Sequence, residues 1–369
     1  MEKFTMKDIW FGFLNVLVAM TAILFVCGTT GINLPLSFLT IGIGTAIFHI
    51  CTKNKLAVLM GVSGSYVGGM ALVGAEYGAA YVAGGVVISG ILYLIAGALF
   101  KWKPQLYNKF PKYILNIAVF LIALNLLPIG ASMITANVGV AAATVAIGFI
   151  LYSNPKTTAW AFPGALVAGT GVSALTGNIV IASAPVALAF TAPAFNFAAF
   201  SLIGVVALAV IFESLGDSTN CANAQGIKLD GKDYSNILIG NGLASTVSGA
   251  LGGLPLTTYS ENVGFIYLTG YKRPNAQLVA SAIFIAMAFI PGITTLFSVI
   301  PGFVYGAMLL FLFAVIGANA VKSIEMKESK NQLVFTAMLA TFFICPPAVF
   351  SPIAASILVG GITHFCIRE

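Results

Sequence analysis

Apolar runs without charge follow one another along almost the whole chain, separated only by short polar segments. A helix needs roughly 20 apolar residues to cross a bilayer. Only 8% of the residues are charged, whereas soluble domains carry about 25%. The sequence therefore predicts an all-α polytopic membrane protein. The candidate spans cover residues 9–28, 33–50, 56–75, 80–100, 113–131, 139–153, 159–176, 198–217, 236–252, 254–270, 275–292, 297–321, 333–345 and 351–366.

The basic residues support this count of fourteen spans. If the N-terminus is cytoplasmic, all 17 Lys and Arg fall in cytoplasmic segments, as the positive-inside rule requires. One span more or fewer would scatter them to both sides. We expect a multi-pass protein of the cell inner (cytoplasmic) membrane with both termini cytoplasmic. The net charge of +6 does not indicate a nucleic-acid partner, because these residues lie in short loops and form no stripe.

Fourteen spans divide into two halves of seven, which predicts an inverted repeat, a common plan among transporters. The third span of each half is irregular: residues 59–70 are rich in glycine and serine, and residues 253–270 contain Pro255, several glycines and Glu261. Paired interrupted spans indicate a binding site near the membrane midplane. Residues 177–197, interrupted by Pro185 and Pro193, are expected to form an outer connection that could include a short interfacial helix.

Three acidic residues fall at membrane depth: Glu213, Asp217 and Glu261. Glu213 and Asp217 are four residues apart and share a helical face. A structural ion pair with Lys or Arg is a weak explanation, since every basic residue is assigned to the cytoplasmic side. A protonated acid that is hydrogen-bonded to backbone or hydroxyl groups remains open. Otherwise these acids suit a carrier that binds a polar solute bearing N–H groups and moves protons with it.

Other polar residues within spans are weaker candidates, because serine and glycine often serve close helix packing. His49 and His364 lie at span ends, where a role at the membrane interface is favoured over a proton relay. No phosphate-binding loop, zinc spacing or nucleophile elbow is present. No enzyme activity, metal or cofactor is predicted, and the driving force would be a proton gradient. The residues that could equally pack or bind are Ser63, Ser65, Tyr66, Asn15 and Asn241.

Glu261-Asn-Val-Gly264, followed by four residues and Thr269-Gly270, resembles the signature of the nucleobase–ascorbate transporters, also called the nucleobase:cation symporter-2 family. Thr257-Thr-Tyr259 and Glu213-x-x-Gly216-Asp217 lie upstream at the places where that family has its own motifs. The resemblance extends over essentially the whole chain, and the bacterial uracil and xanthine permeases look most similar.

The resemblance implies a core domain and a gate domain that also forms a homodimer contact. Spans 3 and 10 would carry short strand-like segments that hold the base. By position, Glu213 and Glu261 would bind ring N–H groups, and Asp217 with Glu213 would couple protons. The remaining substrate-binding candidates are Ser260, Ser63, Gly64, Tyr259 and Asn262. The implied parts are residues 1–105 (core, spans 1–4), 106–191 (gate, spans 5–7), 192–294 (core, spans 8–11) and 295–369 (gate, spans 12–14).

The sequence does not decide whether the base is uracil or xanthine. Asp217 follows the purine-type members, whereas Glu261 and Asn241 follow the uracil type. Gly64 stands where an aromatic residue would adjoin the base. The first span reads Asn15-Val16 instead of the usual Gln-His pair. The sequence thus predicts a proton-coupled nucleobase importer. The alternatives are an anion transporter or channel of the related sulfate-transporter architecture, which would need a positive site, and a membrane scaffold without transport.

Overall fold

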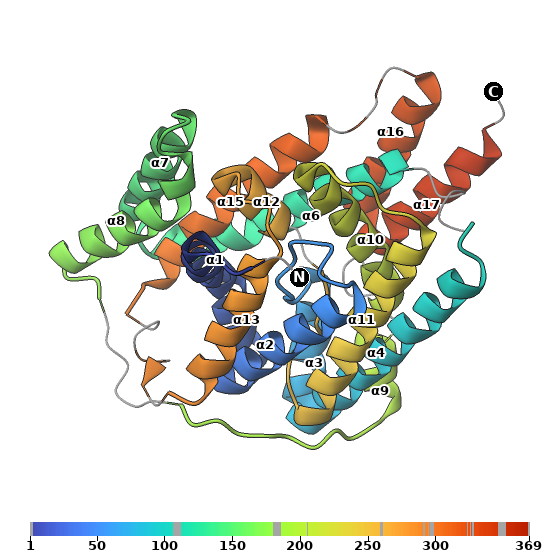
Figure 1. The fold of residues 1–369 in the computed structure, drawn as a ribbon, viewed down its shortest axis with the longest axis horizontal. Helices are drawn as coiled ribbons and strands as arrows, with labels where there is room; N and C mark the ends of the chain where they lie inside the picture. Colours follow the sequence, from blue (N-terminus) through green and yellow to red (C-terminus); the bar gives the residue numbers. More distant parts are fainter. Residues whose placement is uncertain are drawn as a thin grey trace.

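The computed structural model describes residues 3–105, 112–179, 186–204, 206–258, 261–290, 292–293, 295, 299–322, 324, 326, 328–345 and 352–367. Within these ranges the chain is almost entirely helical, as predicted (Figure 1). The first half contains α1 (Met6–Thr30), α2 (Leu34–Cys51), η1 (Gly64–Tyr66), α3 (Val67–Tyr77), α4 (Ala79–Trp102), α6 (Lys112–Met133), η2 (Ile134–Ala136), α7 (Val138–Ser153), η3 (Thr158–Trp160) and α8 (Ala161–Leu175). The second half contains α9 (Phe197–Ala199), the π-helical η4 (Phe200–Gly204), α10 (Val206–Gln225), α11 (Gly231–Leu251), α12 (Glu261–Thr269), α13 (Asn275–Ala288), α15 (Gly302–Lys322), α16 (Ser329–Ile344) and α17 (Pro352–Cys366).

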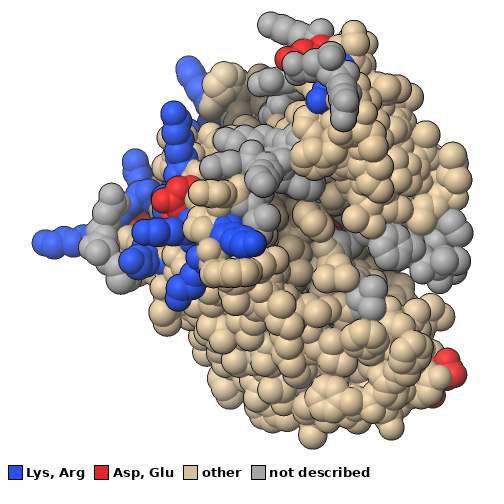
Figure 2. Space-filling view, turned by 90° about the vertical axis from the view of Figure 1, so that its right-hand side faces the viewer, with Lys and Arg blue, Asp and Glu red and all other residues tan. Residues whose placement is uncertain are grey.

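Six helical stretches of the described chain are long and apolar enough to cross a membrane, and four further apolar helices are shorter. Each predicted span overlaps a helix, although the total of fourteen spans stays a prediction. Most of the Lys and Arg side chains visible in Figure 2 gather on one side of the molecule. This clustering is the arrangement expected of a multi-pass protein whose basic loops share one membrane face.

The helices pack in groups that draw on both halves of the chain. α4 packs against α11, α2 against α11 and α13, and α1 against α13, while α15 packs against α6 and α7. In Figure 1, α7 and α8 lie together at one corner, away from α2, α3, α4 and α11. One buried apolar cluster draws mainly on α1–α4 and α10–α13, and another surrounds α15. The division into core and gate domains at the predicted boundaries stays a prediction.

Glycines allow α4 and α11 to approach closely. A Cβ added at Gly90 would lie 2.5 Å from the backbone nitrogen of Thr246, and one added at Gly242 would lie 2.8 Å from that of Leu94. Ser235 reinforces the contact by donating a hydrogen bond of 2.8 Å to the carbonyl of Gly97. Small residues at such crossings let helix backbones come together in a membrane protein.

The connection before α9 differs from the interfacial helix that the sequence allowed. Residues 186–196 have no helical structure, and α9 begins only at Phe197. The amide of Thr191 donates to the carbonyl of Leu251 at 3.1 Å, and the amide of Ala194 donates to Ala80 at 2.8 Å. Pro193 has no N–H group with which to continue a helix. The segment is therefore an extended strap across α11 and the start of α4.

Candidate functional site

The helices of the two irregular spans are interrupted at points that lie next to each other in the fold. In each, an extended segment leads into a short helix: residues 57–63 into η1 and α3, and residues 253–258 toward α12. The segments meet in one antiparallel bridge between Gly61 and Thr257, whose two N–H···O bonds measure 3.0 and 2.8 Å. The predicted strand-like breaks are thus present as a single bridge rather than a regular strand. Non-helical backbone at membrane depth is tolerated where protein buries it.

Glu213 of α10 lies against the start of the first short helix. The hydroxyl of Ser63 donates to its Oε1 at 2.7 Å, and the hydroxyl of Ser65 donates to its Oε2 at 3.2 Å. Glu213 is only 3% exposed. Both serines therefore contact the predicted binding carboxyl rather than only permitting helix packing, and Gly64 lies between them as the first residue of η1.

Glu261 is the first residue of α12 and is 5% exposed. A helix N-terminus favours nearby negative charge, so this position suits a carboxylate. Glu261 lies four residues after Thr257, whose bridge partner Gly61 lies two residues before Ser63, the residue that bonds to Glu213. The fold therefore brings together the two acids that the sequence singled out. The predicted site residues Tyr259 and Ser260 lie outside the described residues.

Asn262 directs its side chain toward the other irregular span. Its Oδ1 accepts a hydrogen bond of 2.8 Å from the amide of Leu59, and its Nδ2 donates one of 2.9 Å to the Leu59 carbonyl. The Asn262 side chain thus bonds to both backbone polar groups of Leu59, as a neighbouring strand would. These two bonds join the start of α12 to the extended segment of span 3.

Asp217 lies one helical turn beyond Glu213 on α10 and is 1% exposed. A chain of polar side chains follows the same helix: Ser214 shares a hydrogen bond with Thr258, and Asn241 of α11 donates to Ser214. On the same irregular span as Thr258, the hydroxyl of Thr257 lies 2.9 Å from that of Tyr93 of α4. Asn241, whose place in the sequence suits packing and binding equally, makes a helix–helix hydrogen bond between α11 and α10.

Several contacts of this region were missed by sequence reasoning. His49 is 3% exposed and its Nε2 lies 2.8 Å from the carbonyl of Val58, a backbone partner that the sequence did not indicate. Asn15 donates to Gln277, which links α1 to α13. Thr45 and His49 are four residues apart in an apolar span, so they share a helical face. This spacing could have indicated a buried polar contact.

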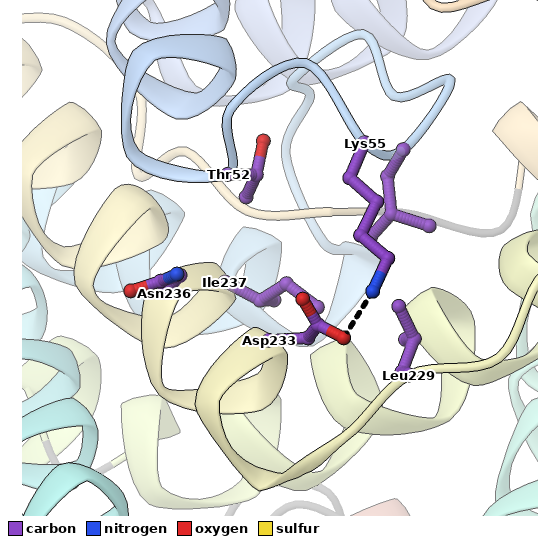
Figure 3. Close-up of a pocket in the computed structure, with 7 residues that line it drawn as sticks. Thr52, Lys55, Leu229, Asp233, Asn236 and Ile237 are labelled. Carbon is purple, nitrogen blue, oxygen red and sulfur yellow. Dashed lines mark hydrogen bonds and ion pairs between the residues drawn. The ribbon is translucent and has the colours of Figure 1, made fainter.

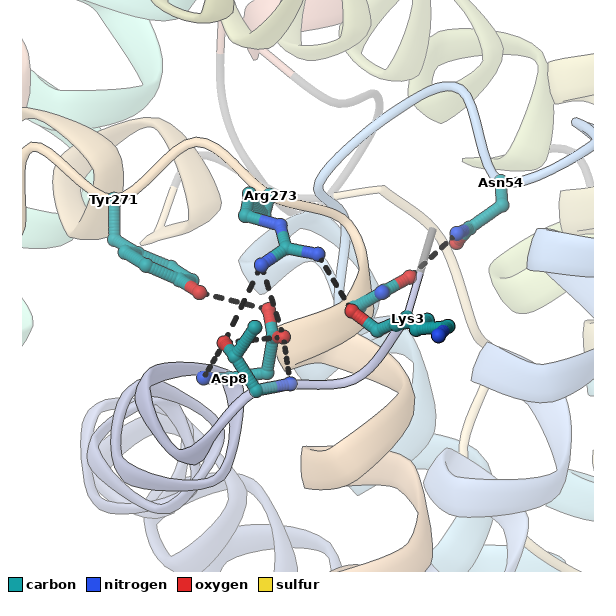
Figure 4. A network of polar contacts seen from close by, with 7 residues as sticks. Lys3, Asp8, Asn54, Tyr271 and Arg273 are labelled. Atoms are coloured by element: carbon teal, nitrogen blue, oxygen red, sulfur yellow. Dashed lines mark hydrogen bonds and ion pairs between the residues drawn. The ribbon is translucent and has the colours of Figure 1, made fainter. Parts of the chain in front are cut away.

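The ion pairs of the described chain lie away from this centre. Lys55 points toward Asp233 beside a pocket that Thr52 and Leu229 also line (Figure 3). Arg273 pairs with Asp8 at 3.3 Å, within the polar network of Figure 4. Neither of these two described pairs includes Glu213 or Glu261. No group of three or more potential metal ligands occurs among the described residues.

Comparison with known proteins decides the family. A family model described as "Permease family", for xanthine and uracil permeases, matches residues 6–165 and 164–345. The chain belongs to the nucleobase–ascorbate transporter family. Since the members are permeases, the prediction that the chain is not an enzyme is confirmed.

Individual relatives have low sequence identity to this chain but align with most of its length. The chain is 24% identical to a probable uracil permease of Pasteurella multocida, covering 92% of this chain and 87% of that one. It is 26% identical to a xanthine permease of Bacillus subtilis, over 76% and 68% of the two chains. The transmembrane domain of a cyanobacterial bicarbonate transporter, BicA, superposes with a TM-score of 0.66 at 16% identity, over 98% of this chain and 97% of that one. The last match establishes the fold alone.

Proposed function

We propose that this protein carries a nucleobase across the cytoplasmic membrane, with uracil and xanthine as the leading substrates. The observation that carries this proposal is that two buried acids lie beside the bridged irregular spans: Glu213 accepts hydrogen bonds from Ser63 and Ser65, and Glu261 begins α12. Ionised carboxylates only accept hydrogen bonds, and a nucleobase presents ring N–H groups that can donate them. The family and the relatives named for uracil and xanthine agree with this chemistry.

Each site residue has a role in this proposal. Glu261 reads one edge of the base, and Glu213 binds the base or a proton while Ser63 and Ser65 orient it. Asp217 assists proton coupling from the next turn of α10. The backbone around Gly64 and near Ser260 would complete the contacts, with Tyr259 as a further candidate. Asn262 serves the site by holding span 3, because its two described hydrogen bonds go to Leu59.

The transport cycle follows from the same plan. A core domain with spans 1–4 and 8–11 moves against a gate domain with spans 5–7 and 12–14, which exposes the site to each side in turn. The proton gradient drives import, both termini lie in the cytoplasm, and the gate domains of two copies form a homodimer.

The first test measures the melting temperature of the purified protein with uracil, thymine, xanthine, guanine and hypoxanthine. Ligands that bind the native state raise its apparent stability. We expect a rise with one class of base that disappears in Glu261→Ala. A protein that no base stabilises would refute the proposal.

The fold shared with a bicarbonate transporter makes an anion carrier the second candidate. An anion would need a positive site, whereas the buried charged groups beside the irregular spans are the acids Glu213 and Glu261. Bicarbonate and sulfate are therefore included in the melting experiment. Stabilisation by an anion, with none by any base, would favour this alternative.

A further inference from the structure

The extended segment of span 3 is held on one side by the second half of the chain. The side chains and backbone that bind it come from α10, α12 and span 10. Its odd-numbered residues make these bonds: the amide of Ala57 donates to Gln225 at 2.9 Å, both polar groups of Leu59 bond to Asn262, and both of Gly61 bond to Thr257.

The even-numbered residues are held on the other side by α2. The amide of Met60 donates to Oγ1 of Thr45 at 3.0 Å, and Nε2 of His49 lies 2.8 Å from the carbonyl of Val58. A carbonyl only accepts, so Nε2 carries the proton. Thr45 and His49 are one helical turn apart on α2, and they are 0% and 3% exposed.

This alternation is the geometry of a strand between two neighbours. Successive residues of an extended chain direct their backbone polar groups to opposite sides, and each group needs a partner where no water is available. The odd-numbered side meets the second half of the chain, and the even-numbered side meets α2. Apart from the backbone pairing of Gly61 with Thr257, side chains thus replace the two adjoining strands of a sheet.

We propose that Thr45 and His49 are positioning residues that fix the register of the span 3 segment, and thereby the place of Ser63 against Glu213. A register error of one residue displaces a strand by about 3.3 Å and turns each backbone group to the wrong side. Ser63, three residues beyond Met60, would then lose its 2.7 Å contact with Glu213. This inference rests on the proposed function only in its link to base binding.

The register is tested by hydrogen–deuterium exchange of the purified protein, which needs no substrate. Thr45→Val keeps the shape of the side chain but leaves the Met60 amide without its acceptor. We expect the peptide spanning residues 57–61 to exchange at least about tenfold faster, which corresponds to about 1.4 kcal/mol. Thr144→Val is the matched control: Thr144 is equally buried, but its hydroxyl bonds only within α7, at 2.8 Å to Val140. Exchange at the wild-type rate in Thr45→Val would overturn the proposal.

The link to the site is tested by the dissociation constant of the base that stabilises the wild-type protein. We expect Thr45→Val and His49→Ala to weaken binding at least about tenfold, and Thr45→Ser and His49→Gln, which restore the acceptor and the donor, to recover it. A purely structural role would reduce the amount of folded protein but leave its affinity unchanged, and that result would also overturn the proposal. If the wild-type protein binds no base, the proposed function fails, and the exchange experiment alone decides whether α2 fixes the register.

Discussion

The network in Figure 4 makes a prediction about what anchors the loop after α12. Asp8 is fully buried and accepts hydrogen bonds from the amide of Thr5 at 2.7 Å, from the hydroxyl of Thr5 at 2.8 Å and from the hydroxyl of Tyr271 at 2.7 Å. Arg273 adds the ion pair at 3.3 Å. The first turn of α1 is thereby fastened to the loop that follows the helix carrying Glu261.

Asp8→Ala removes the acceptor from all of these donors at once. Hydrogen bonds to a charged group contribute about 1.5–3 kcal/mol each, and because the Arg273 side chain left behind is 30% exposed, the whole network is expected to contribute about 3 kcal/mol. With an unfolding entropy of about 2.1 cal/mol/K per residue, a loss of about 3 kcal/mol lowers the melting temperature of this 369-residue chain by about 4 °C.

Lys55→Met is the matched control. It breaks the ion pair of Figure 3, whose side chains are 40% and 18% exposed, and exposed pairs contribute only about 0–1 kcal/mol. Melting of the purified proteins, followed by intrinsic fluorescence, should therefore show a change of about 1 °C or less for this variant. If Asp8→Ala melts within a degree of Lys55→Met, the reasoning about the buried network is refuted.

Three further predictions concern the site and its support. Glu213→Ala should abolish uptake of radiolabelled base while the protein still reaches the membrane, and full transport would show that the site is assigned wrongly. Glu261→Gln replaces an acceptor with a partial donor, so competition assays should reveal a changed order of base preference; an unchanged order would remove Glu261 from the contact. Gly242→Ala places a methyl group against the α4 backbone and should lower the free energy of unfolding by about 1–3 kcal/mol. Gly171→Ala, whose added methyl group meets nothing within 4 Å, is the control and should leave the melting temperature unchanged. Equal melting temperatures for the two variants would contradict the close packing of α4 and α11.

Local features of the sequence were enough to predict the kind of fold. Spans can be recognised from apolar length, and glycine, proline and hydroxyl residues within two of them mark where the helices break. Glu213 and Glu261 stood out because a charge at membrane depth is costly and is therefore a functional candidate by default. The described helices, the bridge between Gly61 and Thr257 and the family match agree with these predictions.

Contacts between residues that are far apart in the sequence could not be predicted in the same way. Ser63 and Glu213 are 150 residues apart in the sequence, and nothing in either segment indicates that one contacts the other. His49 ends a span, and only the structure shows that the chain after α2 folds back and brings the carbonyl of Val58 to its Nε2. The connection before α9 was also ambiguous, because apolar residues with prolines suit either an extended strap or a short helix.

The sequence by itself determined that this chain is a multi-pass membrane protein with two interrupted spans and acids at membrane depth. These properties depend on composition over short windows, since the bilayer selects segments one at a time. Only the tertiary structure decided which side chains bond to the backbone N–H and C=O groups that the interrupted helices leave without helical partners. Every polar group there needs a partner, and the partners come from helices that folding alone brings together.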